Sequence, residues 1–208
     1  MISNIRRTLC LVLLGAVAPG IAWAGGPRDH EKGFFLRMLA GGGSAGSKIE
    51  VGSESIDLSG TSGVFDFAIG GTVAPNLAIY GTFFGWLVSD PDAEVKADSL
   101  GSASGTFNGD LDMAALGAGV TYYFMPINLY LAGSIGMGSL TGDGGDLEGL
   151  ETDSGLALNF VVGKEWWVSG RWGLGVAGAF GYHSFPDKDV DENWTGTNFS
   201  LLFSVTFN

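Results

Sequence analysis

The sequence of 208 residues is short of charge, of proline and of cysteine. Charged residues make up 15% of the chain, whereas an average soluble domain has about 25%. Six prolines and an aromatic content of 12% are not the composition of a collagen-like or disordered chain. The one cysteine, Cys10, lies in a segment that we expect to be removed, so disulfides are excluded as a source of stability in the mature protein.

The first 24 residues have the features of a cleaved signal peptide. Arg6 and Arg7 precede an apolar stretch that ends in the triplet A-W-A at 22–24, which fits an A-x-A cleavage site. This stretch is too short for a membrane-anchoring helix and is interrupted by Pro19. Cleavage removes two arginines and changes the formal charge from −12 to −14. We therefore expect an exported protein in which residues 25–33 form a short periplasmic leader.

The remaining chain lacks any apolar run of about 18 residues, which excludes a transmembrane helix but not a transmembrane β-barrel. Eight segments of about ten residues read as strands. They are Phe34–Gly43, Gly63–Val73, Ala78–Val88, Leu111–Phe124, Leu129–Ser139, Ser154–Trp166, Trp172–Tyr182 and Gly196–Phe207. The pattern predicts an all-β fold, an eight-stranded antiparallel up-and-down transmembrane barrel over residues 34–208.

Most of these segments alternate between large apolar and small or polar residues. In the last one, Phe199, Leu201 and Phe203 share one parity, and only Leu202 breaks the polar parity. Such alternation indicates strands with one apolar and one polar face. The segment Ala78–Val88 is apolar on both parities, so its faces cannot be assigned from the sequence.

The connections alternate between tight turns and long loops, and charge follows the same division. The predicted loops are Ala45–Thr61, Ser89–Asp110, Leu140–Asp153 and His183–Thr195. They hold seventeen of the 22 acidic residues and three lysines, a net charge of −14. Alternation of short and long connections is typical of outer-membrane barrels, whose periplasmic turns are short and whose external loops are long.

A soluble β-sandwich is the competing architecture. A sandwich buries its large apolar face, whereas here the opposite face is small and rich in glycine, as the narrow interior of a small barrel requires. Aromatic residues also gather where strands meet the short turns, as in the aromatic girdles of membrane barrels. These residues are Tyr122, Phe124, Trp166, Trp172 and Phe207. The barrel is therefore the better interpretation.

These features together resemble the eight-stranded outer-membrane barrels of the OmpA/OmpX type. The run Gly163–Tyr182 resembles a hairpin of this outer-membrane β-barrel domain family, and the C-terminal "FSVTFN" resembles its terminal strand. The resemblance implies a place in the Gram-negative outer membrane, with both termini periplasmic. It also implies contact with outer-membrane lipids and lipopolysaccharide, and assembly by the barrel-assembly machinery. Two departures are that no C-terminal peptidoglycan-binding domain is expected and that Asn208 follows the terminal aromatic Phe207.

Two histidines are candidates for chemistry. We expect His30, in the leader, to be solvated. His183 and Ser184 weakly resemble the His-x-Ser motif of lipid A deacylase barrels, but adjacent strand residues point to opposite faces and could not pair as base and nucleophile. We therefore expect His183 to lie at the rim and predict no catalytic residue.

The acidic loops contain a candidate cation site. Asp187, Asp189 and Asp191 alternate as oxygen ligands for Ca²⁺ could, but Glu192 stands where an EF-hand loop needs glycine. We predict no metal or cofactor site beyond weak divalent association with these loops.

Four residues fall on the polar parities that should face the interior: Arg37, Asp66, Asn159 and Glu165. We expect them to form a hydrogen-bonded plug, with an Arg37–Glu165 pair as one hypothesis, because buried charges must be compensated. The alternative is the lining of a narrow, porin-like channel. Eight strands leave an interior that side chains can fill, which favours the plug.

The sequence thus predicts a structural or surface-interaction protein that presents acidic loops to an unknown extracellular partner. A lipid-modifying enzyme and a narrow channel are the alternatives. Loops of negative charge exclude a nucleic-acid partner.

Overall fold

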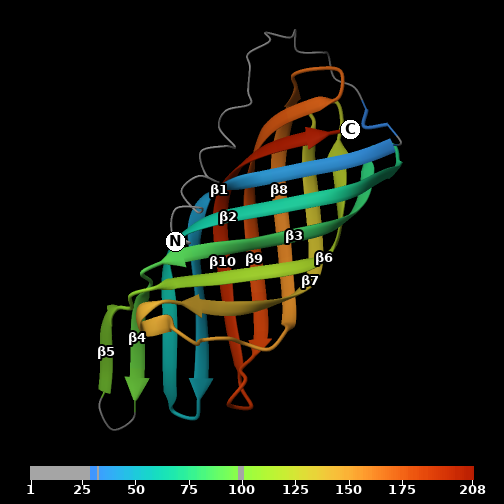
Figure 1. Ribbon diagram of the computed structural model, residues 1–208. Coiled ribbons are helices and arrows are strands. Elements are labelled where there is room, and N and C mark those ends of the chain that lie inside the picture. Colours follow the sequence, from blue (N-terminus) through green and yellow to red (C-terminus); the bar gives the residue numbers. More distant parts are fainter. Residues whose placement is uncertain (1–28, 32, 98–100) are drawn as a thin grey trace, which may run out of the picture.

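The computed structural model describes residues 29–31, 33–97 and 101–208, so the predicted signal peptide lies outside the described residues. Eight strands build one closed antiparallel sheet (Figure 1). They are β1 (Gly33–Val51), β2 (Glu54–Ala74), β3 (Leu77–Ser89), β6 (Asp110–Phe124), β7 (Leu129–Asp143), β8 (Gly155–Trp167), β9 (Trp172–Pro186) and β10 (Asn193–Phe207). Within the described part of the chain, no helix is long and apolar enough to cross a bilayer.

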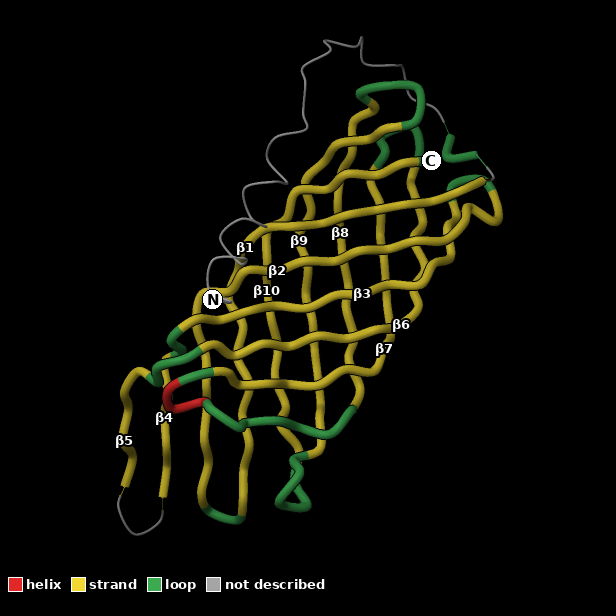
Figure 2. The backbone as a smooth tube through the Cα atoms, in the orientation of Figure 1, coloured by secondary structure: helices red, strands yellow, loops and turns green. Residues whose placement is uncertain are grey.

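Each of these strands pairs with the next along the chain, and β1 closes the barrel by pairing with both β2 and β10. The closing register runs from Leu36 opposite Phe207 to Lys48 opposite Thr195. Closure satisfies the backbone hydrogen bonds of the terminal strand, which would otherwise be a sheet edge. The predicted eight-stranded up-and-down barrel is confirmed. Figure 2 shows the strands crossing the barrel at a steep tilt.

Alternation divides every strand into an inward and an outward face. Outward residues include Leu201, which is 79% exposed, and Phe203, which is 75% exposed, whereas Leu202 between them is buried inside. On β3, whose faces the sequence left open, Tyr80 and Trp86 face the interior. A barrel only eight strands wide has room for such large side chains where the opposite strands carry small ones.

The barrel has a turn end, where short connections join the strands, and a loop end. The turn end contains the tight turns around Asn76 and Asn128, both with positive φ (64° and 53°), a conformation that asparagine tolerates in such turns. The five predicted girdle aromatics lie on strand segments near this end. Trp172 packs edge-on against Phe207 with ring centroids 5.1 Å apart.

The loop end differs from the prediction. The segment Ala45–Thr61 is not a loop, because β1 and β2 continue as one hairpin with unbroken pairing as far as Val51 opposite Glu54. Apolar Ile49 and Leu58 are buried there, so this hairpin has an apolar inner face that favours extended strands. The segment His183–Thr195 is also shorter as a loop than predicted, since β9 reaches Pro186 and β10 begins at Asn193.

The predicted loop Ser89–Asp110 contains a second hairpin, β4 (Asp92–Ala97) and β5 (Gly101–Thr106). Strand β4 pairs with the distal part of β2, so β1, β2, β4 and β5 form a sheet that projects beyond the barrel (Figure 1, lower left). The predicted loop Leu140–Asp153 holds the end of β7 and a short 3₁₀ helix, η1 (Gly145–Leu147).

The interior has two packed halves. The turn-end half combines aromatic and small residues around polar groups. The loop-end half is a cluster of large apolar side chains that includes Trp86, Phe185, Trp194 and Leu147. The expectation of a small, glycine-rich inner face therefore does not describe the loop-end half, where large apolar side chains fill the interior.

Candidate functional site

The turn-end half of the lumen is organised around a fully buried arginine, Arg37 on β1. Its Nη1 donates to Thr121 Oγ1 at 2.7 Å and its Nη2 donates to Tyr80 Oη at 3.2 Å. The guanidinium carbon also lies 5.2 Å from the ring centroid of Tyr80 and 5.1 Å from that of Tyr130. Aromatic faces stabilise a desolvated cation, so these rings partly replace the water that Arg37 loses.

Two buried carboxylates flank this cation and are held by hydrogen bonds. Glu165 Oε1 accepts from Ser204 Oγ and Thr206 Oγ1, both at 2.6 Å. Asp66 accepts from Thr82 Oγ1 at 3.0 Å and from Asn159 Nδ2 at 2.9 Å.

The predicted interior positions of Arg37, Asp66, Asn159 and Glu165 are confirmed, since all four are buried. The direct Arg37–Glu165 ion pair is wrong: Glu165 is bonded to hydroxyl groups of β10, and Arg37 to Thr121 and Tyr80.

Glycines at the paired positions of neighbouring strands make the room for the large rings. A Cβ added at Gly163 would lie 2.4 Å from the Tyr130 ring, and one at Gly119 would lie 2.5 Å from the Tyr80 ring. Both contacts are shorter than carbon atoms tolerate, so these positions require glycine for packing. The small, glycine-rich parity in the sequence therefore marks where tyrosines of other strands lie.

His30, one of the described residues of the predicted leader, lies against the turn end of the lumen. His30 stacks on Tyr123 with ring centroids 3.6 Å apart, and its Nε2 lies 3.0 Å from Asn128 Oδ1. The backbone of His30 also exchanges two hydrogen bonds with Asn76, through its N–H and its carbonyl. The expectation of a solvated His30 is wrong, because its side chain is 1% exposed. The sequence shows only that His30 precedes a strand rich in aromatic residues, and it does not indicate that His30 contacts Tyr123, Asn128 and Asn76.

The expected position of His183 at the rim is also wrong. His183 is fully buried rather than at the rim, because β9 continues past Tyr182 and places it on the inward parity. Its Nε2 lies 2.9 Å from Ser47 Oγ, and its ring stacks on Phe185 at 4.9 Å. Ser184 is on the opposite parity, as predicted, and does not join this pair. Extending the period-two alternation by one residue beyond Tyr182 would have located His183 correctly.

The His183–Ser47 pair does not have the surroundings of a hydrolase site. Both side chains are buried and are enclosed by the apolar loop-end cluster, which keeps a substrate away. Nδ1 of His183 has no hydrogen-bond partner, whereas a catalytic base is usually oriented by a third group.

The candidate cation loop is folded around one of its own carboxylates. Asp187 Oδ1 accepts from the backbone N–H groups of Asp189 and Val190, and Asp187 Oδ2 accepts from Trp194 Nε1 at 2.8 Å. Partial burial opposes ionisation, but these hydrogen bonds outweigh it and lower the pKa of Asp187 below its ordinary value. Asp187 thus acts as a structural acceptor. Within the described residues, no group of three His, Cys, Asp or Glu side chains is placed to hold a metal.

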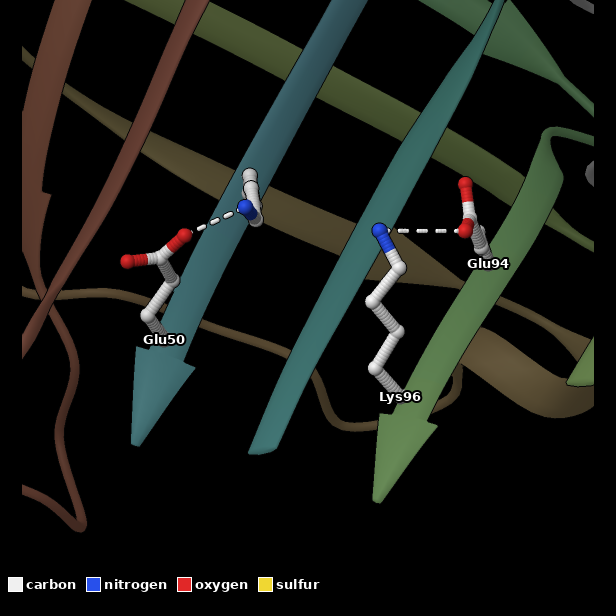
Figure 3. Close-up of polar contacts among 4 residues, drawn as sticks. Glu50, Glu94 and Lys96 are labelled. Atoms are coloured by element: carbon white, nitrogen blue, oxygen red, sulfur yellow. Dashed lines mark hydrogen bonds and ion pairs between the residues drawn. The ribbon is translucent and has the colours of Figure 1, made fainter. Parts of the chain in front are cut away.

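The projecting sheet carries much of the acidic surface. Lys48 pairs with Glu50 on β1, and Lys96 pairs with Glu94 on β4 at 3.1 Å (Figure 3). Asp57 and Asp92 lie on the same face, because the register places Asp57 opposite both Lys48 and Glu94. A hollow of about 460 Å³ lies on this face between β2, β4 and β5.

Comparison with solved structures finds outer-membrane proteins of similar fold. Neisserial surface protein A matches with a TM-score of 0.50 at 14% identity, covering 86% of this chain and 99% of that chain. The outer membrane protein OprG from Pseudomonas aeruginosa gives a TM-score of 0.48 at 13% identity, covering 86% of this chain and 98% of that one. Ail, the attachment invasion locus protein of Yersinia pestis, gives 0.39 at 13% identity, with 84% and 99% covered.

No family model matches the chain, and no curated protein sequence does. The expected likeness to eight-stranded barrels of the OmpA/OmpX type is confirmed as a likeness of fold.

Proposed function

We propose that this protein is an outer-membrane barrel with a closed lumen, which anchors an acidic, partly β-structured surface outside the cell. The observation that carries the proposal is that the outer surface of the barrel is apolar around its middle, whereas its loop end is acidic. A belt of exposed apolar side chains surrounds the barrel, among them Leu116, Phe160 and Leu201. Such a belt is stable only in contact with lipid or another apolar surface. The acidic hairpins extend from one end of it, where the long loops of such barrels face the outside.

The packing of the lumen supports anchoring over conduction. His30 covers the turn end, the Arg37 network fills the next layer, and the apolar cluster around Trp86 fills the loop-end half. A diffusion pore needs a continuous water path, and the buried side chains of these layers, within the described residues, favour a lumen without one. Planar-bilayer recordings of the refolded chain should therefore stay flat. Stable, reproducible conductance steps would contradict the closed-lumen proposal.

Orientation has a direct test, because the mature chain is expected to lack cysteine. Asp189→Cys introduces one thiol at the loop end, and Gly170→Cys introduces a matched thiol at the turn end. An impermeant maleimide added to intact cells should label the first variant and not the second. Labelling of Gly170→Cys alone would place the loops on the periplasmic side and overturn the proposal. Heat-modifiable migration on unboiled gels would establish that both variants are folded.

We propose no enzymatic role. A lipid-modifying hydrolase would depend on His183, so unchanged lipid A in a His183→Ala strain with normal amounts of folded barrel supports a non-enzymatic protein. Altered lipid A in that strain would reverse this view. Contacts with lipopolysaccharide and the assembly machinery, and weak divalent cation association with the loops, remain predictions.

A further inference from the structure

The projecting sheet ends in a strand whose outer edge is free. β5 pairs with β4 and, among the described residues, with no other strand. All six of its residues, with the sequence GSASGT, are exposed. An open edge presents unpaired N–H and C=O groups to any chain that can extend alongside it.

Natural edges are usually protected against such pairing, and β5 has few of the usual protective features. It contains no charged residue and no proline. Its pairing with β4 is continuous from Asp92 opposite Thr106 to Ala97 opposite Gly101, without a bulge that would twist the edge away. Added strands commonly dock on edges of this kind, with the backbone supplying affinity and the side chains supplying specificity.

The side chains beside the edge define the chemistry of such a strand. On the outer face, the register aligns Asp57, Glu94 and Ser104 in one cross-strand row, and Ser59, Asp92 and Thr106 in the next. The opposite face packs inward, since Leu58 and Ala93 are buried. The hollow of about 460 Å³ is lined by both of the outer rows. Asp92 and Glu94 therefore stand on β4, one strand in from the edge, and Asp57 stands one strand further in, with the small residues of β5 between them and the edge.

We propose that the free edge of β5 docks an extended, basic peptide segment of another protein. This inference rests on the proposed function, because the edge must face outside the cell to meet its partner. A strand added to β5 would lie about 10 Å, or two strand spacings, from β4. Long Lys or Arg side chains can cross the small Ser104 and Thr106 to reach Glu94 and Asp92. Basic residues at every second position would meet the two acidic rows.

A second copy of this chain fits the edge less well. Antiparallel pairing of two β5 edges would make one continuous sheet with the same face of each copy on the same side. The carboxylates of Asp92 and Glu94 from both copies would then line that face. These two sets of carboxylates would lie about 14 Å apart, or three strand spacings, and would repel rather than attract each other. The acidic surface thus favours a basic partner over self-association.

The test uses the full chain refolded in detergent micelles, with heat-modifiable migration as the check on folding. The probe is a fluorescein-labelled octapeptide of alternating Lys and Thr. Two matched control peptides carry the same charges but have alternate backbone amides N-methylated, one in each register, so that strand pairing is blocked on one side. A fourth peptide alternates Glu and Thr.

We expect saturable binding of the Lys-Thr peptide by fluorescence anisotropy, and weaker binding of at least one N-methylated peptide. Asp92→Asn with Glu94→Gln should weaken binding about threefold to tenfold, since the two exposed charge contacts on β4 are lost. Backbone amides of 101–106 should gain protection from hydrogen exchange when the peptide binds.

Binding of both N-methylated peptides as tight as that of the Lys-Thr peptide, tighter binding of the Glu-Thr peptide, or a peptide-independent dimer that protects 101–106 would each overturn the proposal. Thiol labelling of intact cells separates this result from the proposed function. Binding in micelles with inverted labelling would refute the cell-surface role but not the edge, and correct labelling without binding would refute only the edge.

Discussion

Replacing Arg37 by methionine should destabilise the barrel strongly, because the interior is built around this cation. The substitution keeps an unbranched apolar stem but removes the donors to Thr121 and Tyr80. It also removes the positive charge that interacts with Asp66 and Glu165, both of which stay buried. Removal of one partner from a buried charged group typically costs about 3–5 kcal/mol, because the remaining charge is uncompensated. We expect Arg37→Met to lie in this range.

The loss of stability in Arg37→Met should depend on whether the carboxylates of Asp66 and Glu165 are present. In a background with Asp66→Asn and Glu165→Gln, both amides can still accept the hydroxyl hydrogen bonds, and no buried negative charge remains. Arg37→Met should then cost only what the two hydrogen bonds and the ring contacts contribute, about 1–3 kcal/mol. Arg37→Lys is the charge-retaining control, and it should fall between the native protein and Arg37→Met.

Urea unfolding from lipid vesicles, followed by tryptophan fluorescence and by migration on unboiled gels, measures these differences. The reasoning would be refuted if Arg37→Met lost less than about 1 kcal/mol, below even one charged hydrogen bond. It would also be refuted if the loss were the same in the carboxylate-neutralised background, since Arg37 would then be acting through packing alone.

Three further predictions concern the outer face, the interior and a loop. Leu201→Arg should reduce the free energy of folding into vesicles by about 2–4 kcal/mol if Leu201 faces the middle of the bilayer, whereas Leu201→Phe should fold normally. Gly163→Val should block or slow assembly, seen as loss of the heat-modifiable band, because its Cβ would enter the ring of Tyr130. The pKa of Asp187 is lowered in the folded loop, so its stabilising effect is present above the ordinary aspartate pKa and is lost as the pH falls through the lower, folded value. Protection factors of the amides around Trp194, which correct for the intrinsic pH dependence of exchange, should therefore be constant near neutrality and fall in acid, and Asp187→Ala should remove that dependence.

Many features of the barrel can be predicted from short segments of the sequence taken one at a time. Period-two alternation is a property of each strand, so the outward positions of Phe65, Phe67 and Leu201 follow from the sequence, and so do the inward positions of Arg37 and Glu165. The same pattern predicted that His183 and Ser184 face opposite sides. It erred only where a strand was ended too early, as at Tyr182, beyond which β9 continues to Pro186.

Contacts within the lumen are not local. Which inward side chains meet depends on strand tilt and on the register around the closed sheet. The sequence therefore indicated that Arg37 needs compensation but not that Thr121 and Tyr80 provide hydrogen bonds to it. The failure at His30 has the same cause, since the leader is held by turns 46 and 98 residues further along the chain.

The sequence by itself determined the strand number, the faces of most strands and the concentration of acidic charge in alternate connections, because these depend on periodicity and composition along the chain. Only the tertiary structure decided that His30 lies against the aromatic residues of the turn end and that a large apolar cluster fills the loop-end half, and that β4 and β5 extend the sheet to a free edge. These features depend on the register between strands that are distant in the sequence. That register closes the barrel between β1 and β10 and leaves β5 as the open edge of the projecting sheet.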